Sequence, residues 1–144
     1  PSMNKYHSLR ASALLALIVF AAPAVAGDKL HVVYHVADEE KAVFALNNIQ
    51  NHIDGAGGAD KVHIVLVSHG PAVKRFVDID AVDRVRSGIA KLQEQGVEFE
   101  ACANTLKALG VEPDELLPGF AIAETGGVTR IAELQSQGYV YIRP

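Results

Sequence analysis

Five short apolar runs separated by helix-like segments constrain the fold of this chain most strongly. Each run is rich in β-branched and aliphatic residues, as strands covered on both faces are; the runs span residues 30–36, 62–68, 97–101, 120–123 and 139–142. Strands that alternate with helices along a chain pair in parallel through right-handed crossovers and carry helices on both faces. The sequence therefore predicts the α/β class, as a three-layer α/β/α domain with a five-stranded, mainly parallel sheet.

Helical periodicity and capping residues predict helices in the segments between the runs. As an example, Asp78 or Asp80 is a candidate cap for a helix that ends at Gly96. Its apolar face is predicted to consist of Val82, Val85, Ile89 and Leu92.

The first 26 residues have the order of a secretory signal peptide. Lys5 and Arg10 precede an apolar run over residues 11–22, and the small-residue sequence Ala24, Val25, Ala26 follows. The run is shorter than the roughly 20 apolar residues that a membrane-spanning helix needs. We expect cleavage after Ala26 and a periplasmic or otherwise exported mature protein. Met3 is the only methionine, so Pro1 and Ser2 are expected to be cloning remnants.

Residues 27–144 are then one domain, long enough for one core. Removing Lys5 and Arg10 from the 13 basic residues leaves 11 against 17 acidic ones, a formal charge of −6. Phosphate binding needs an excess of Lys and Arg, so nucleic acid is not an expected partner. Neither is a membrane, once the signal peptide has been removed.

Cys102 is the only cysteine in the sequence. It lies where the strand 97–101 gives way to a helix that ends near Gly110. Unpaired N–H groups at a helix start favour negative charge, so a thiol at this place is more readily a thiolate. A lone cysteine in an exported protein is either reactive, buried as a small apolar residue, or paired with another chain.

Other chemically useful groups follow neighbouring predicted strands, where ligands collect in parallel sheets. They are His35 near the end of the first strand, His69 after the second, Cys102 after the third and Glu124 after the fourth. We take Cys102 and His69 as candidate catalytic residues, and His35, Gly70, Asn104 and Glu124 as candidate substrate-binding residues. The alternative for each histidine is an ordinary hydrogen-bonded loop residue.

Two further patterns have plain interpretations. Glu98 and Glu100 share one face of their strand and are predicted to lie in a solvated face. Gly126 and Gly127 either cradle an anion or simply allow a helix to begin. No metal site is predicted, because no compact Cys/His spacing occurs.

Several motifs together resemble the DsrE/DsrF-like family. They are the His69-Gly70-Pro71-Ala72 strand end, the strand from Gly96 to Cys102 leading into Asn104 and Thr105, the Leu117-Pro118-Gly119 break, and the Gly138-Tyr139-Val140-Tyr141-Ile142 ending. The resemblance covers residues 27–144. It implies an α/β/α domain with five parallel strands, assembly as trimers or hexamers, and a sulfur relay in which the cysteine matching Cys102 carries a persulfide.

The leading hypothesis is therefore a sulfur-binding or sulfur-transfer protein without a cofactor. Cys102 accepts sulfane sulfur, His69 assists by a hydrogen bond or proton transfer, and a sulfur donor or acceptor protein is the expected partner besides further copies of the chain. The alternative is an oligomeric small-ligand-binding or structural module without chemistry. The surroundings of Cys102 separate the two hypotheses, since an inert cysteine would be enclosed by apolar residues such as Phe99 and Leu106.

Overall fold

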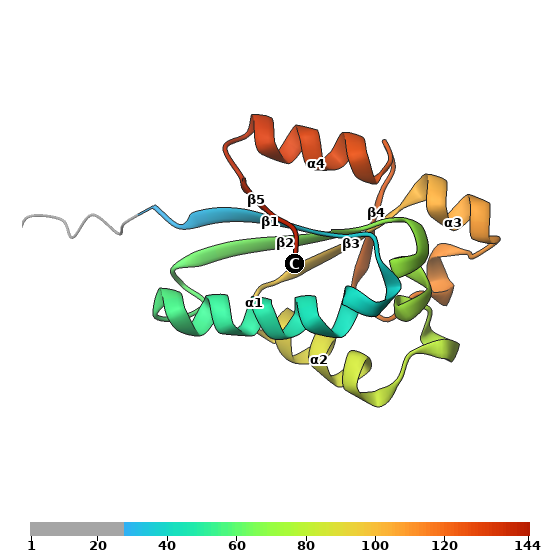
Figure 1. The fold of residues 1–144 in the computed structure, drawn as a ribbon, viewed down its shortest axis with the longest axis horizontal. Helices are drawn as coiled ribbons and strands as arrows, with labels where there is room; N and C mark the ends of the chain where they lie inside the picture. The colour runs from blue at the N-terminus through green and yellow to red at the C-terminus, as the bar shows by residue number, and fades with distance from the viewer. Residues whose placement is uncertain (1–27) are drawn as a thin grey trace, which may run out of the picture.

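A computed structural model describes residues 28–144 (Figure 1). The predicted signal peptide, residues 1–26, and its cleavage point lie outside these residues. The strands are β1 (Leu30–Val36), β2 (Val62–Ser68), β3 (Glu98–Cys102), β4 (Phe120–Ala123) and β5 (Val140–Ile142). The α-helices are α1 (Ala42–Ala56), α2 (Asp83–Glu94), α3 (Ala103–Leu109) and α4 (Gly127–Ser136), and short 3-10 turns span Glu39–Lys41, Gly70–Phe76, Asp78–Asp80 and Pro113–Glu115.

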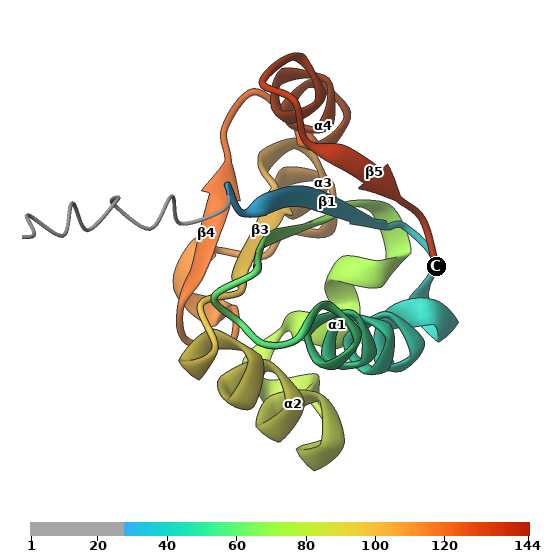
Figure 2. The same cartoon turned by 90° about the vertical axis from the view of Figure 1, so that its left-hand side faces the viewer.

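The five strands form one sheet in the order β4-β3-β2-β1-β5, and every neighbouring pair is parallel. Helices α1 and α2 cover one face, and α4 covers the other (Figures 1 and 2). The predicted fold class is therefore confirmed. Because α4 connects β4 to β5 across the sheet, its first residues lie beside the carboxyl end of β3.

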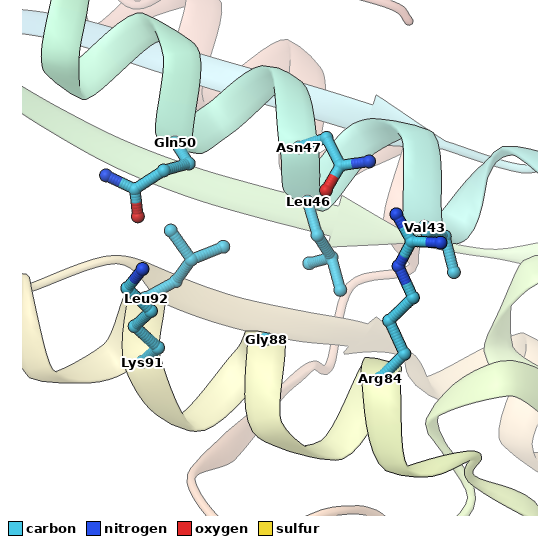
Figure 3. A pocket seen from close by; sticks show the side chains of 8 residues that line it. All are labelled: Val43, Leu46, Asn47, Gln50, Arg84, Gly88, Lys91 and Leu92. Atoms are coloured by element: carbon cyan, nitrogen blue, oxygen red, sulfur yellow. The ribbon is translucent and has the colours of Figure 1, made fainter.

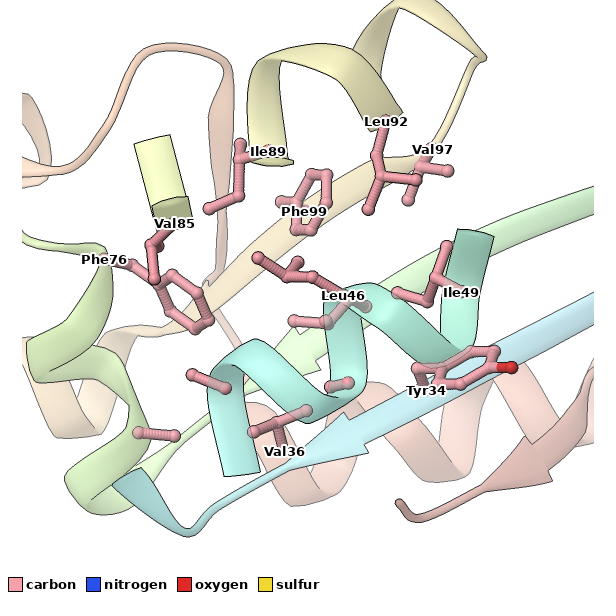
Figure 4. Packing of buried hydrophobic residues seen from close by; sticks show 14 of the residues in the cluster. Tyr34, Val36, Leu46, Ile49, Phe76, Val85, Ile89, Leu92, Val97 and Phe99 are labelled. Carbon is pink, nitrogen blue, oxygen red and sulfur yellow. The ribbon is translucent and has the colours of Figure 1, made fainter. Parts of the chain in front are cut away.

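The two faces of the sheet differ in chemistry. The face under α1 and α2 carries the main hydrophobic core, in which Phe76 and Phe99 pack with Leu46, Ile49 and Ile89 (Figure 4). Under α4 the apolar cluster is small: Val33, Val65, Val67, Ile131 and Leu134. The core under α1 and α2 therefore holds the fold together, and the α4 face has room for polar side chains.

The start of α2 differs from the sequence prediction. Asp78 and Asp80 belong to a separate 3-10 turn, and α2 begins at Asp83 without a side-chain cap. Val82 has extended backbone and is 51% exposed, so the buried face of α2 begins at Val85. The extra turn moves the start of the helix past Val82, which therefore cannot point into the core.

The predicted solvated face of Glu98 and Glu100 is wrong for Glu100. Only 8% of Glu100 is exposed, because Arg130 on α4 lies over it. The guanidinium donates from Nε to Oε2 at 2.8 Å and from the second terminal nitrogen to Oε1 at 2.9 Å. Glu98 is exposed and pairs with His63 at 3.2 Å. A bidentate ion pair thus fastens α4 to the middle of β3.

Within residues 28–144, no helix is both long enough and apolar enough to span a bilayer.

Replacing Arg130 with Met should leave the Glu100 carboxylate buried without its counter-charge. We expect the free energy of unfolding, measured by urea denaturation, to fall by about 3 kcal/mol. Arg86→Met is the matched control, because Arg86 pairs with Asp78 on the exposed surface and its loss should cost less than about 1 kcal/mol. An equal cost for the two variants would contradict a structural role for the Glu100–Arg130 pair.

Candidate functional site

The carboxyl ends of β1, β2 and β3 bring His35, His69 and Cys102 to one edge of the sheet. His35 lies in β1 opposite Val67, and His69 directly follows β2 and donates its backbone N–H to Val36 at 3.1 Å. Cys102 is the last residue of β3 and also the residue that caps α3. The prediction that this cysteine lies at a strand-to-helix junction is confirmed.

Cys102 lines a polar hollow of about 260 Å³, which we call the Cys102 hollow. Its other lining residues are His69, Asn104, Thr105, Thr125, Gly126, Gly127, Val128 and Thr129. Cys102 is 6% exposed, yet it belongs to neither hydrophobic cluster of the fold. Hydroxyl and backbone groups therefore lie around the thiol on the side of the hollow.

Hydrogen-bond donors around the sulfur favour its charged form. Burial alone raises the pKa of the Cys102 thiol, but hydrogen bonds from the Thr105 hydroxyl and from the backbone N–H groups of Gly127, Thr105 and Asn104 outweigh it. The net result is a pKa below the ordinary value of a cysteine. Two helix starts, those of α3 and α4, supply the N–H groups, so the thiolate has partners already in position.

Thr105 is held so that its hydroxyl proton is available to the sulfur. The backbone N–H of Gly70 donates to Thr105 Oγ1 at 2.9 Å. A hydroxyl carries a single proton, and a hydroxyl oxygen that accepts from Gly70 keeps that proton for donation to Cys102. Gly70 has φ +60°, a left-handed conformation that glycine adopts without strain. Gly70, which was predicted to bind substrate, therefore acts on the sulfur indirectly, by positioning the Thr105 hydroxyl.

A side chain at Gly127 would be crowded by its neighbours. A Cβ atom at this position would lie 3.0 Å from Cβ of His69 and 3.2 Å from Cβ of Cys102. The first turn of α4 consequently touches both predicted catalytic residues. Close packing therefore explains Gly127 without a bound anion.

His69 is linked to His35 and Tyr141 by short hydrogen bonds. Nε2 of His69 lies 2.5 Å from Nε2 of His35, and Nδ1 of His35 lies 2.6 Å from the Tyr141 hydroxyl oxygen. Burial, the neighbouring His69 and the charge of Arg143 lower the pKa of His35 to about 4 against the opposing charge of Asp38. Burial and Arg143 also lower the pKa of His69. Both rings are therefore neutral at neutral pH.

A model of the DsrE/DsrF-like family matches residues 29–144. The chain belongs to this family. The resemblance seen in the sequence is thus confirmed, and it places the protein in a family associated with sulfur metabolism in general. Among curated proteins, none matches this chain.

Solved structures share the fold of this DsrE/DsrF-like chain. A protein of unknown function from Methanobacterium thermoautotrophicum, MTH1491, is 31% identical, with a TM-score of 0.72 over 81% of this chain and 100% of its own. The ychN protein from E. coli is 15% identical, with a TM-score of 0.62 over 81% and 98% of the two chains. BT1422 from Bacteroides thetaiotaomicron, a conserved protein of unknown function, is 19% identical, with a TM-score of 0.61 over 79% and 94%.

The remaining site residues predicted for this family member are not all brought together. Asn104 borders the Cys102 hollow, and its backbone N–H supports the thiolate. Glu124 is exposed and lines a separate hollow with Lys107 and Pro113. The reason is the turn after β4, which carries Glu124 away from the sulfur before α4 begins.

Sequence reasoning missed the roles of Thr105 and Tyr141. The position of Thr105, three residues after the cysteine in the first turn of a helix, was a usable signal. The sequence around Tyr141 holds no such signal, since its contact with His35 depends on the pairing of β5 with β1.

A second hollow, between α1 and α2, is lined by no cysteine, serine, threonine or histidine (Figure 3). It is lined by aliphatic, amide and basic side chains: Val43, Leu46, Asn47, Gln50, Arg84, Lys91 and Leu92, with Gly88 at its base. Within the part of the chain that the structure describes, no group of three or more His, Cys, Asp or Glu residues is arranged to hold a metal ion. The chemistry available to this fold therefore centres on the Cys102 hollow.

The Thr105 hydroxyl can be tested with a matched pair of variants. Thr105→Val keeps the shape of the side chain but removes the donor, so the pKa of Cys102 should rise and alkylation by iodoacetamide at neutral pH should slow roughly tenfold. Thr105→Ser keeps the donor and should react like the wild type. Identical pH profiles of alkylation for all three proteins would show that the hydroxyl does not act on the sulfur.

Proposed function

We propose that this protein accepts sulfane sulfur on Cys102 and carries it as a persulfide. The observation that supports this most is the set of donors around the sulfur, because a thiolate is the form of cysteine that attacks electrophilic sulfur. Membership of a family associated with sulfur metabolism points the same way.

The reaction is an exchange between two sulfur atoms. The Cys102 thiolate attacks the outer sulfur of a donor persulfide, R–S–SH, and a new S–S bond forms on Cys102. The S–S bond of the donor breaks, its electron pair leaves with R–S⁻, and that thiolate then takes up one proton. No external oxidant or reductant is needed, and the reverse exchange passes the sulfur to an acceptor thiol.

The Cys102 hollow suits this cargo in size and polarity. Its volume of about 260 Å³ exceeds what one further sulfur atom needs. The N–H groups of Thr105 and Gly127 face the thiol sulfur and remain within reach of a second, negatively charged sulfur bonded to it. Asn104 and the hydroxyl of Thr129 line the same space and are available to a substrate.

The rival function, a binding or structural module without chemistry, is favoured by one observation. Cys102 is only 6% exposed, as an inert cysteine would be. Against this, Phe99 and Leu106 belong to the main hydrophobic cluster, and Cys102 instead lines the Cys102 hollow. An inert cysteine needs no hydrogen-bond donors around its sulfur, whereas Cys102 has the Thr105 hydroxyl and three backbone N–H groups there, so we favour sulfur chemistry.

We also propose a location and an assembly for the protein. The signal-peptide pattern in residues 1–26 supports an exported mature protein, and membership of the DsrE/DsrF-like family supports assembly with further copies of the chain, as a trimer or hexamer. A sulfur donor or acceptor protein would be the other partner.

Mass spectrometry after incubation with polysulfide tests the proposed function. We expect one or more added sulfur atoms on Cys102 of the wild type, lost again on treatment with a thiol reductant. Cys102→Ser should gain none, and its melting temperature should stay close to that of the wild type. Wild-type protein that gains no sulfur would overturn the proposal in favour of the rival.

A steric pair of variants refines the same experiment. Gly127→Ala places a methyl group against Cys102 and His69 and should reduce sulfur loading strongly. Gly55→Ala is the matched control, since a Cβ atom there meets nothing within 4 Å and the residue lies within α1. Equal loading of the two variants would show that the hollow beside Gly127 is not where sulfur is received.

A further inference from the structure

We propose that Tyr141, His35 and His69 form a proton relay that joins solvent to the Cys102 hollow and moves the proton exchanged during sulfur loading. The inference deepens the proposed function and rests on it. It assigns catalytic work to two residues, Tyr141 and His35, that lie outside the hollow itself.

The geometry of the three side chains is that of a continuous chain of hydrogen bonds. Tyr141 on β5 contacts Nδ1 of His35 at 2.6 Å, and Nε2 of His35 contacts Nε2 of His69 at 2.5 Å. The planes of the two imidazole rings differ by only 20°. Both nitrogens of His35 are therefore engaged, one on each side, as a bridging residue requires.

The chain has one end in solvent and one end at the sulfur site. Tyr141 is 39% exposed, whereas His35 and His69 are partly buried. His69 lines the Cys102 hollow, and its Nδ1 is the ring nitrogen that His35 does not use. A proton passed along the chain thus travels from the hollow to the surface without crossing the core.

Neutral rings are needed for such a relay, and the surroundings keep them neutral. A neutral imidazole has one N–H and one free lone pair, so it accepts a proton at one nitrogen while releasing one from the other. Burial and Arg143 lower the pKa of both histidines, while Asp38 partly opposes this. Arg143 and Asp38 lie near each other, 3.4 Å apart, so their effects on the rings partly cancel and burial remains the main cause.

The proton steps balance over one round of loading. When Cys102 loses its proton, Nδ1 of His69 receives one, and His69 passes the proton on its Nε2 to Nε2 of His35. The Nδ1 proton of His35 moves to Tyr141, whose own hydroxyl proton leaves to water. When the donor's S–S bond breaks, the same chain runs backwards and protonates the leaving thiolate, so no net proton or electron is consumed.

Nuclear magnetic resonance of histidine labelled with ¹⁵N tests the hydrogen-bonded chain without any sulfur chemistry. We expect both rings of the wild type to be neutral at neutral pH, with one ring N–H between His35 and His69 that exchanges slowly with water. Tyr141→Phe should change the tautomer balance of His35. A cationic ring at neutral pH, or freely exchanging ring protons, would overturn the relay.

Rapid-mixing kinetics with glutathione persulfide test the catalytic role of the relay. Tyr141→Phe and His35→Gln should load sulfur about 10- to 100-fold more slowly than the wild type, while iodoacetamide alkylates Cys102 at an unchanged rate. Free imidazole in solution should restore the rate of His35→Gln. Tyr139→Phe is the matched control, because Tyr139 makes an edge-to-face contact with His31 away from the relay, and this variant should load normally.

The outcomes separate the two proposals. Normal loading by both relay variants, or slow loading that imidazole does not restore, would overturn the relay and leave sulfur transfer standing. No sulfur on the wild type would overturn the proposed function and the catalytic role of the relay together, and the resonance experiment would still show whether the hydrogen-bonded chain exists.

Discussion

The contact between the first turn of α4 and the end of β3 is the constraint on which the site depends. Gly127 packs against Cβ atoms of both Cys102 and His69, and its N–H reaches the sulfur. Arg130, three residues further along α4, holds the helix down through Glu100 in the same strand. A close approach and an ion pair, both made by α4, thus set the position of every donor that the helix contributes.

One face of the sheet provides most of the stability of the protein, and the other carries the polar site. Under α1 and α2, large apolar side chains are buried and provide most of the stability, since burial of apolar area is the dominant favourable term in folding. Under α4, the apolar cluster has five buried residues, and polar groups from β1, β2 and β3 share the remaining space. His35, His69, Glu100 and Cys102 all project from this face, where alternation along the strands places them. The stable face therefore allows the other to carry buried polar groups that stability alone would not favour.

The sequence predicts the layers of this fold well and the contacts between them poorly. Runs such as Leu30–Val36 and Val62–Ser68 show their strands through composition, and parallel pairing follows from the helices between them. The place of Cys102 at a helix start is equally local, so it was predictable. In contrast, Glu100 looked solvated because its partner, Arg130, is 30 residues away and meets it only after α4 has crossed the sheet.

The same distinction explains which candidate site residues the structure brings together. Glu124 follows β4 as Cys102 follows β3, but the turn before α4 carries it to another hollow. Tyr141 lies at the far end of the chain and reaches His35 because β5 pairs with β1, a strand order that periodicity does not encode. Which groups follow a strand is a local property, and which of them meet is set by strand order and by the loops.

The central claim is that the Cys102 hollow holds a sulfur atom bound to the Cys102 thiol. A crystal structure of the protein after treatment with polysulfide measures this most directly. The account predicts a second sulfur bonded to Sγ, pointing into the hollow and within hydrogen-bonding distance of the backbone N–H of Gly127 or Thr105. A second sulfur that points out of the hollow, or an unmodified Cys102 in crystals of protein whose mass shows no added sulfur, would contradict it.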